Sequence, residues 1–242
     1  MTGFDELWPG GPRFKQTEQS FKLSTDSVLL AAFANMSRVR RCLDLGSGAG
    51  VLCVLLGYAN PASEILGVEL QEDFAALSRE NLAENLLSNA SVITADLREH
   101  RALFPAESFD LVVTNPPYFS ENSGYSAPED FRAAAREEKT CTMEDICAAA
   151  RFALRWGGTM AIVHRPERLS ELFCAMSAAG IEPKRLRMVV HSAERAPSLV
   201  LIEGRRGGRP GLIIEPPLIL TDGHGGDSEE IQKIYHRGSF AK

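Results

Sequence analysis

The hydrophobic and polar positions follow two alternating periods between residues 41 and 180. Short apolar runs bounded by polar or glycine residues, which are typical of buried strands, occur at 42–45, 64–70, 91–97, 109–114 and 159–164. Between them apolar residues recur at helical spacing, and we expect helices at 51–58, at 71–87, at 143–156 and from Pro166 to Gly180. Strands that alternate with helices predict a mostly parallel, Rossmann-like doubly wound α/β sheet with helices on both faces.

The pattern changes in the last third of the chain. The β-like runs 185–191 and 198–204 are separated by a short polar turn instead of a helix. They predict an antiparallel hairpin at the edge of a sheet that has seven strands in all. We find no repeat and no long linker, so we expect a single domain over residues 1–242. Its parts are an N-terminal extension at 1–40 with a helix at 26–34, a core at 41–204 and a C-terminal extension at 205–242.

A glycine-rich turn follows the first predicted strand and reads Asp44-Leu-Gly46-Ser47-Gly48-Ala-Gly50. Glycine at every second position lets the backbone bend sharply and come close to a ligand. In doubly wound folds ligands bind outside the carboxyl ends of the strands, which is where this turn lies. A dinucleotide fingerprint would need glycine where Val51 stands, so the spacing differs from that motif.

Two acidic residues mark the ends of the next two predicted strands, Glu69 on the second and Asp96 on the third. A carboxylate at the end of the second strand can accept both hydroxyl groups of a ribose. Either acid alone could equally be a solvated residue at a strand end. The glycine turn resembles the first motif of the S-adenosylmethionine-dependent methyltransferases. That resemblance implies that Asp44, the turn and Glu69 hold this cofactor and that Asp96 contacts its adenine amino group.

The fourth predicted strand ends in Asn115-Pro116-Pro117-Tyr118-Phe119. Proline restricts the backbone and removes a donor, so the strand stops at Thr114 and the Asn115 amide is held at its mouth. The Asn115 side-chain oxygen and the Pro116 carbonyl can accept the two N–H groups of a ring-conjugated amino group while positive charge develops on its nitrogen. Tyr118 can stack on a planar substrate, and Phe119 is either a second stacking wall or a core residue. The alternative is a plain Asn-Pro turn with core aromatics.

Composition and charge narrow the choice of partner. The chain is 44% hydrophobic, has a net charge of −6 and carries five scattered cysteines without a C-x-x-C spacing. These features argue against a disulfide framework or a zinc site and favour a reducing cytoplasm, and no apolar run is long enough to span a membrane. Basic residues cluster only late in the chain, either as a solvated face or as phosphate contacts, at Arg165/Arg168, Lys184/Arg185/Arg187 and Arg205/Arg206/Arg209.

The chain resembles the bacterial tRNA(Val) adenine-N6 methyltransferase family from about residue 13 to 237. The segments that carry this resemblance are F14-K-Q, S24-T-D-S-V-L-L-A-A-F33, N115-P-P-Y-F, A-R136-E-E, W156-G-G, H164-R-P-E-R168, K184-R-L-R and P216-P-L. It implies methylation of the adenine beside the anticodon of a valine tRNA, with tRNA as partner and no metal. Thr25 and Asp26, which otherwise form a helix N-cap, could then close over the methionine end of the cofactor.

Two alternative functions remain open from the sequence. The Asn-Pro-Pro-Tyr motif also occurs in the release-factor glutamine methyltransferases, whose substrate likewise offers a planar amide nitrogen. About 40 residues precede the first core strand, which is short for the helical N-terminal domain that this second family usually carries. The other alternative is a non-catalytic RNA-binding protein on the same fold. It predicts loss of the glycine turn, Glu69 or Asn115, and all of them are present. His164 we expect to be structural.

Overall fold

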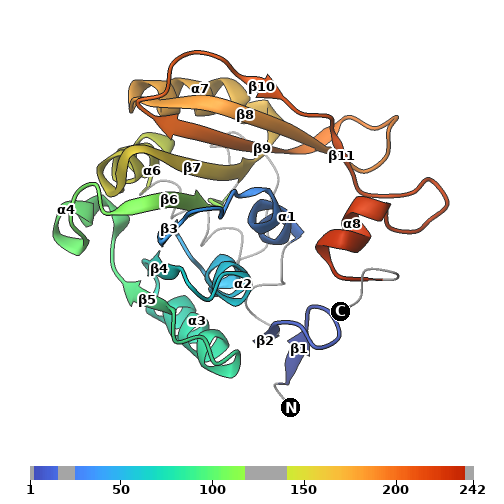
Figure 1. Ribbon diagram of the computed structural model, residues 1–242, viewed down its shortest axis with the longest axis horizontal. Coiled ribbons are helices and arrows are strands. Elements are labelled where there is room, and N and C mark those ends of the chain that lie inside the picture. Colours follow the sequence, from blue (N-terminus) through green and yellow to red (C-terminus); the bar gives the residue numbers. More distant parts are fainter. Residues whose placement is uncertain (1–2, 16–24, 118–140, 238–242) are drawn as a thin grey trace, which may run out of the picture.

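A computed structural model describes residues 3–15, 25–117 and 141–237 of the chain. Its centre is one large sheet with the strand order β10-β8-β9-β7-β6-β3-β4-β5, which Figure 1 shows from top to bottom, and β11 also pairs with β8. The parallel half consists of β3 (Arg41–Leu45), β4 (Glu64–Glu69), β5 (Ala90–Thr94), β6 (Phe109–Thr114) and β7 (Leu154–His164). The predicted α/β fold class is therefore confirmed.

The strand order reverses at β3, which lies between β4 and β6 and is parallel to both. Ligand crevices of open α/β sheets form at such a point, outside the carboxyl ends of the strands. The connecting helices are α2 (Val51–Ala59), α3 (Glu72–Glu84), α4 (His100–Leu103), α6 (Met143–Ala153) and α7 (Leu169–Ala178), with short 3-10 turns η1 (Leu97–Glu99) and η2 (Pro166–Arg168).

The antiparallel hairpin predicted for the end of the sheet is present as β8 (Ile181–Val190) and β9 (Pro197–Arg206). Strand β9 lies between β7 and β8 and is antiparallel to both. Two two-residue strands, β10 (Ile213–Ile214) and β11 (Leu218–Ile219), pair with the outer side of β8. Within the described residues the sheet consequently has nine strands, which are the seven that we predicted together with β10 and β11.

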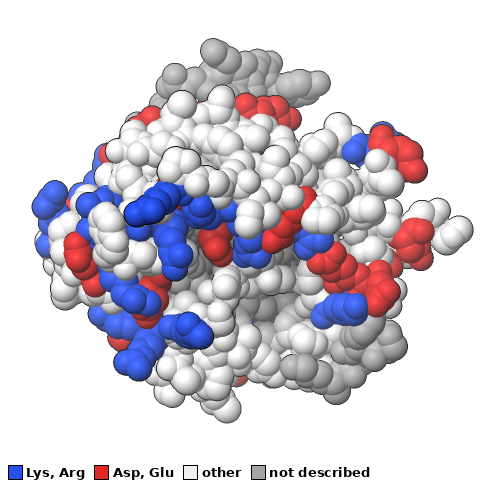
Figure 2. Space-filling model, turned by 45° about the horizontal axis from the view of Figure 1, so that its top comes forward, with Lys and Arg blue, Asp and Glu red and all other residues white. Residues whose placement is uncertain are grey.

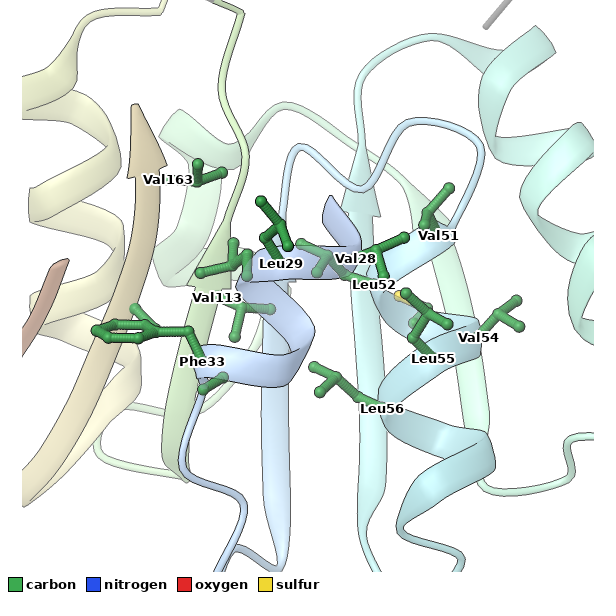
Figure 3. Packing of buried hydrophobic residues seen from close by; sticks show 14 of the residues in the cluster. Val28, Leu29, Phe33, Val51, Leu52, Val54, Leu55, Leu56, Val113 and Val163 are labelled. Atoms are coloured by element: carbon green, nitrogen blue, oxygen red, sulfur yellow. The ribbon is translucent and has the colours of Figure 1, made fainter. Parts of the chain in front are cut away.

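Alternating side chains divide the apolar residues between the two faces of the sheet, as the two-residue period of a strand requires. On β6, Val113 joins a cluster with α1 (Thr25–Phe33), α2 and α3, whereas Val112 joins a cluster with α6 and α7. Figure 3 shows Val28 and Leu29 of α1 on the side toward Leu52 of α2, and Phe33 of α1 pointing to the other side. Each such buried aliphatic or aromatic side chain stabilises the fold by about 1.5–3 kcal/mol relative to exposure.

Several predicted boundaries differ from the structure, and two of these differences change the element to which a motif residue belongs. The helix predicted to reach residue 156 ends at Ala153, and β7 begins at Leu154, so the Trp156-Gly-Gly segment belongs to a strand. The third strand ends at Thr94, so Asp96 lies beyond it, at the N-cap of η1. In both places pairing with a neighbouring strand sets the boundary, which the local pattern does not record.

The terminal extensions pack on the same side of the sheet and touch each other, since the Trp8 and His236 rings lie 4.6 Å apart between centroids. The hairpin β1 (Phe4–Glu6) and β2 (Arg13–Lys15) lies against α3, and α8 (Glu229–Ile234) contacts α1. Within the described ranges, no helix has the length and apolar character needed to cross a membrane.

Candidate functional site

The glycine turn is a tight loop at the carboxyl end of β3. The backbone N–H groups of Gly46 and Ser47 both donate to the Val68 carbonyl, over 2.9 and 3.0 Å. Gly46, Gly48 and Gly50 have φ angles of 72°, 53° and 79°, values in the left-handed region that side chains disfavour. A Cβ on Gly46 or Gly48 would meet nothing within 4 Å, so the loop borders open space there.

Glu69 at the end of β4 fastens this loop. Its Oε2 accepts from the Gly48 N–H over 2.7 Å, and its Oε1 accepts from the Gln71 N–H over 2.9 Å. The side chain is 7% exposed, so these charge-assisted bonds fix the carboxylate beside the glycine turn. The two features that the sequence placed at neighbouring strand ends thus touch each other.

Asp44 lies beneath the loop and is fully buried. Its Oδ2 accepts from Cys53 Sγ at 3.4 Å, while its Oδ1 has no hydrogen-bond partner in the described residues. The Asp44 pKa is raised to about 7, chiefly by desolvation and also by the charge of Glu69, against the lowering effect of the hydrogen bond from Cys53. A buried acceptor without a donor is costly, so Asp44 is suited to a ligand that brings a donor or positive charge.

Ser47 provides a second unsatisfied group in the same loop, because its buried Oγ also lacks a partner in the described part of the chain. The loop is held from below by Asn81 of α3, whose Nδ2 donates to the Ala49 carbonyl over 2.9 Å. The left-handed glycines, the fixed Glu69 carboxylate and these two unsatisfied oxygens fit a small polar cofactor with ribose hydroxyls and cationic groups.

The end of β6 is tied to this loop from the other side. Thr114 Oγ1 donates to the carbonyl of Leu45, the residue before Gly46, over 2.8 Å. The next residue, Asn115, donates from Nδ2 to Ser27 Oγ of α1 over 2.9 Å, and Pro116 is buried. This hydrogen bond fixes which end of the Asn115 side-chain amide is the nitrogen, so the other end is the side-chain oxygen, which is the acceptor atom of the group. Tyr118 and Phe119 lie outside the described residues.

The other predicted cofactor residues occupy the margins of this region. Asp96 accepts from the Arg98 N–H over 2.9 Å and forms an ion pair with the Arg98 guanidinium, and these contacts hold the Asp96 pKa below its usual range. Thr25 and Asp26 form the first turn of α1. The Thr25 side chain is hydrogen-bonded to that of Tyr235, so α1 begins against the C-terminal extension.

The predicted substrate cations do not form one group. Arg165 donates to the Ser198 carbonyl over 3.3 Å, and Arg168 forms an ion pair with Glu171 at the start of α7. Along β8 each basic side chain has a partner within the protein. Lys184 donates to the Arg209 carbonyl. Arg185 forms ion pairs with Glu203 and Glu215, and Arg187 forms one with Glu230. A phosphate at Arg185 or Arg187 would have to compete with these carboxylates.

Ser27 and Asn81 are the two site residues that sequence reasoning missed. Both are buried, and each bonds to a group far away in the chain. Ser27 stands within the S24-T-D-S segment of the family resemblance, which was the only signal for it, whereas the α3 pattern treats Asn81 as an ordinary helix residue.

His164 is buried, accepts from the Arg165 N–H and has its pKa lowered to about 4, mainly by desolvation.

The fold and this site define a methyltransferase: the model of the family "Methyltransferase small domain" matches residues 22–176, and the chain belongs to that family. The relatives include proteins named tRNA1(Val) (adenine(37)-N6)-methyltransferase. The one from Porphyromonas gingivalis is 30% identical over 78% of this chain and 76% of its own length, and one from Escherichia coli O157:H7 is 31% identical over 76% and 74%.

Solved structures agree on the fold. A predicted O-methyltransferase from Agrobacterium tumefaciens superposes with a TM-score of 0.72 at 21% identity, covering 88% of this chain and 96% of that one. TrmN from Thermus thermophilus gives 0.52 at 20% identity, over 74% and 48%. S-adenosylmethionine is the methyl donor of this enzyme.

Proposed function

We propose that the enzyme methylates the N6 amino group of an adenine in tRNA, at position 37 beside the anticodon of a valine tRNA. The observation that carries the proposal is the Asn115 amide, fixed by Ser27 at the end of β6 and joined through Thr114 and Leu45 to the glycine turn. The names of the relatives, which specify tRNA1(Val) and adenine 37, support the choice of substrate.

The residues that would hold the cofactor are those of the first two strand ends. Glu69 would accept ribose hydroxyls while it keeps the Gly48 N–H, and Asp44, Ser47 and the backbone from Gly46 to Gly50 would surround the remaining polar groups. Asp96, Thr25 and Asp26 complete the proposed set at the margins. When bound, S-adenosylmethionine supplies an electrophilic methyl group on a sulfonium.

Asn115 would act on the amino group that receives the methyl. The lone pair of adenine N6 is delocalised into the ring, so the nitrogen becomes nucleophilic only as it leaves the plane. The Asn115 oxygen and the Pro116 carbonyl would accept its two N–H groups and stabilise the positive charge that develops on nitrogen. The ordered hydrogen bond to Ser27 keeps the amide oriented, so no reorganisation is required during the reaction.

A strong general base is not required for this reaction, because the methylated ammonium is acidic and can lose its proton to water or to the same acceptors. His164 is unsuited to that role, since it is buried and its Nδ1 already accepts from the Arg165 N–H. Adenine in an anticodon loop is unpaired, so turning it into the site costs less than extracting a base from a duplex. Tyr118 and Phe119 would stack on it.

The role of Asn115 is tested by Asn115→Ala. We expect S-adenosylmethionine affinity, measured by calorimetry, to stay nearly unchanged while the single-turnover methylation rate falls by roughly 100-fold or more, as removal of one preorganised hydrogen-bond partner does elsewhere. Ser27→Ala should lower the rate by a smaller factor, because the amide is retained but not held. The exposed Asn35→Ala is the matched control and should react at the wild-type rate. A wild-type rate in Asn115→Ala would contradict this mechanism.

The substrate is tested by offering alternatives together. Enzyme with methyl-labelled cofactor is incubated with tRNA that lacks this modification, with release factors and with duplex DNA. We expect label in tRNA only, and N6-methyladenosine at position 37 after digestion. Label on glutamine would establish the protein substrate instead, and label in DNA with unlabelled tRNA would exclude the tRNA assignment.

A further inference from the structure

A second concave site lies at the end of the sheet opposite the glycine turn, where the parallel strands begin. It is a pocket of about 350 Å³ lined by Trp156 and Gly157 of β7, Lys184 of β8 and the segment 205–210 that ends β9. Strands β7 and β8 run parallel to β6, so their amino-terminal parts lie at the end of the sheet away from Asn115. In Figure 1 this is the left end of β8, and Figure 2 shows Lys and Arg side chains gathered on that side.

The pocket displays an indole that the fold holds in place. Between the pairs Phe109↔Leu154 and Leu111↔Thr159, β7 has extra residues that form a bulge, and this bulge turns Trp156 out of the sheet. The ring is packed on Gly207, where a Cβ would lie 2.4 Å from it, and the side chain nevertheless remains 68% exposed. An aromatic face that is ordered yet exposed is a stacking platform, which needs little further ordering on binding.

The charged residues that line the pocket are all basic, and the acidic Glu182 lies next to it as the cross-strand partner of Arg205. Arg205 and Arg209 are exposed, and Lys184 is half-buried with its ammonium on the Arg209 carbonyl. Arg205 donates to the Gly157 carbonyl over 3.0 Å, and within the described ranges no ion pair engages either guanidinium. Arg206 differs, since it is 4% exposed and held by Glu107 and the Leu154 carbonyl. Arg206 therefore supports the turn, while Arg205, Arg209 and Lys184 face the opening.

We propose that this pocket binds one nucleotide of the tRNA outside the active crevice, with its base stacked on Trp156 and its phosphate held by Arg205 and Arg209. The proposal rests on the proposed function, since it gives the same RNA a second point of attachment. The pocket volume is within the range of small-ligand sites. Sites for single-stranded nucleic acid combine an aromatic ring, on which a base stacks, with cations that bind the phosphates. An acidic peptide would contact the cations but not the indole ring.

The chain has two tryptophans, so Trp8→Phe leaves Trp156 as the only fluorescent indole. In that background we expect full-length tRNA to quench the Trp156 emission, with a midpoint that matches binding measured by filter retention. A polyglutamate peptide should leave the emission unchanged. Unchanged emission at saturating tRNA, or equal quenching by polyglutamate, would overturn the proposal.

Kinetics with two substrates separates this site from catalysis. Trp156→Ala is expected to raise KM for full-length tRNA at least 5-fold without changing kcat, and to leave KM for an isolated anticodon stem-loop unchanged. Arg205→Gln/Arg209→Gln should weaken tRNA binding and lower the salt dependence of log Kd by about 1 for each phosphate that the variant no longer neutralises. Tyr58→Ala and Lys233→Gln, at exposed positions outside the pocket, are the matched controls.

The outcomes are distinguishable from failure of the proposed function. A wild-type enzyme that methylates no RNA would refute the function. A wild-type enzyme that methylates tRNA while Trp156→Ala and Arg205→Gln/Arg209→Gln keep wild-type KM and salt dependence would refute only the pocket. If thermal unfolding shows that Trp156→Ala is not folded, Trp156→Leu retains an apolar side chain on Gly207 without a stacking ring, and it must show the same rise in KM.

Discussion

Two acidic side chains at the end of the parallel strands, Asp44 and Glu69, are both buried but are satisfied differently. Glu69 receives two backbone N–H groups, whereas one oxygen of Asp44 has no donor in the described structure. The first is therefore a preorganised charge and the second a carboxyl group whose proton is easily retained. This difference gives each residue a separate experimental signature.

For Glu69, substitution by alanine should weaken S-adenosylmethionine binding by about 1–3 kcal/mol, because a charge-assisted acceptor is removed and the Gly48 N–H is released. Titration calorimetry measures this directly. Glu64→Ala, at the exposed start of the same strand, is the matched control and should bind normally. Unchanged affinity in folded Glu69→Ala would remove this residue from the cofactor site.

For Asp44, the signature is the pH dependence of stability. Its pKa is raised to about 7 in the folded protein, whereas the unfolded chain keeps an ordinary value near 4. Between about pH 4 and 7 the native state holds a proton that the unfolded state has released, so this group makes the free energy of unfolding fall as pH rises. Urea unfolding of Asp44→Asn across this window should show a flatter slope than wild type. Asp5→Asn, an exposed position, should keep the wild-type slope.

At the scale of elements, α3 connects the N-terminal hairpin with the glycine turn. Asn81 accepts from the Lys15 N–H over 2.8 Å and donates to the Ala49 carbonyl, so one buried amide joins β2, α3 and the loop. Asn85 makes a related pair of bonds to the backbone of Arg13 and does not touch the loop. The helix thus holds the hairpin through two asparagines and the loop through one of them.

Asn81→Ala should therefore lower the free energy of unfolding by about 1–3 kcal/mol, since buried backbone groups lose their partner, and should also weaken cofactor binding. Asn85→Ala should lower stability less and leave cofactor affinity unchanged. Chemical denaturation and calorimetry on the two variants measure both effects. Equal cofactor affinity in the two variants would show that the loop does not depend on Asn81.

Elements with strong apolar runs could be predicted from the sequence, whereas elements whose bounds depend on pairing with a neighbouring strand could not. The run 109–114 became β6 without change, because it is buried on both faces and ends at prolines. Leu154, Arg155 and Trp156 favour a helix locally, but the pairing of Leu154 with Phe109 of β6 places them in a strand. The strands β10 and β11 are too short to leave a pattern. The contact of Asn115 with Ser27 joins distant segments and has no local signal.

At the scale of the whole molecule, the C-terminal extension is held against the sheet by the pairing of β10 and β11 with β8 and by ion pairs from β8, of which Arg187–Glu230 reaches α8. The Arg187 guanidinium donates to both oxygens of Glu230 over 2.6 and 2.7 Å and from Nε to the Pro216 carbonyl over 3.0 Å. This contact raises the Arg187 pKa and lowers that of Glu230. The side chains are 19% and 47% exposed, so solvent screens part of the attraction.

A double-mutant cycle of Arg187→Ala and Glu230→Ala should therefore give a coupling energy of about 0.5–1 kcal/mol, read from urea unfolding. The cycle on Lys233 and Glu229, an exposed pair one helical turn apart, is the control and should give about 0.3 kcal/mol. Limited proteolysis of Arg187→Ala should cut first in the C-terminal extension. Equal coupling in the two pairs would mean that the Arg187 contact does not fasten the extension.

The position of β9 between β7 and β8 also determines the order in which the sheet can be completed during synthesis. Strand β9 is made after both of its neighbours, so the hydrogen-bonding edge of β7 remains open until residue 206 has left the ribosome. An open strand edge is a template for pairing with another chain. The nascent protein is consequently most prone to aggregation after β7 has emerged, and the late strand that closes the sheet also removes that hazard.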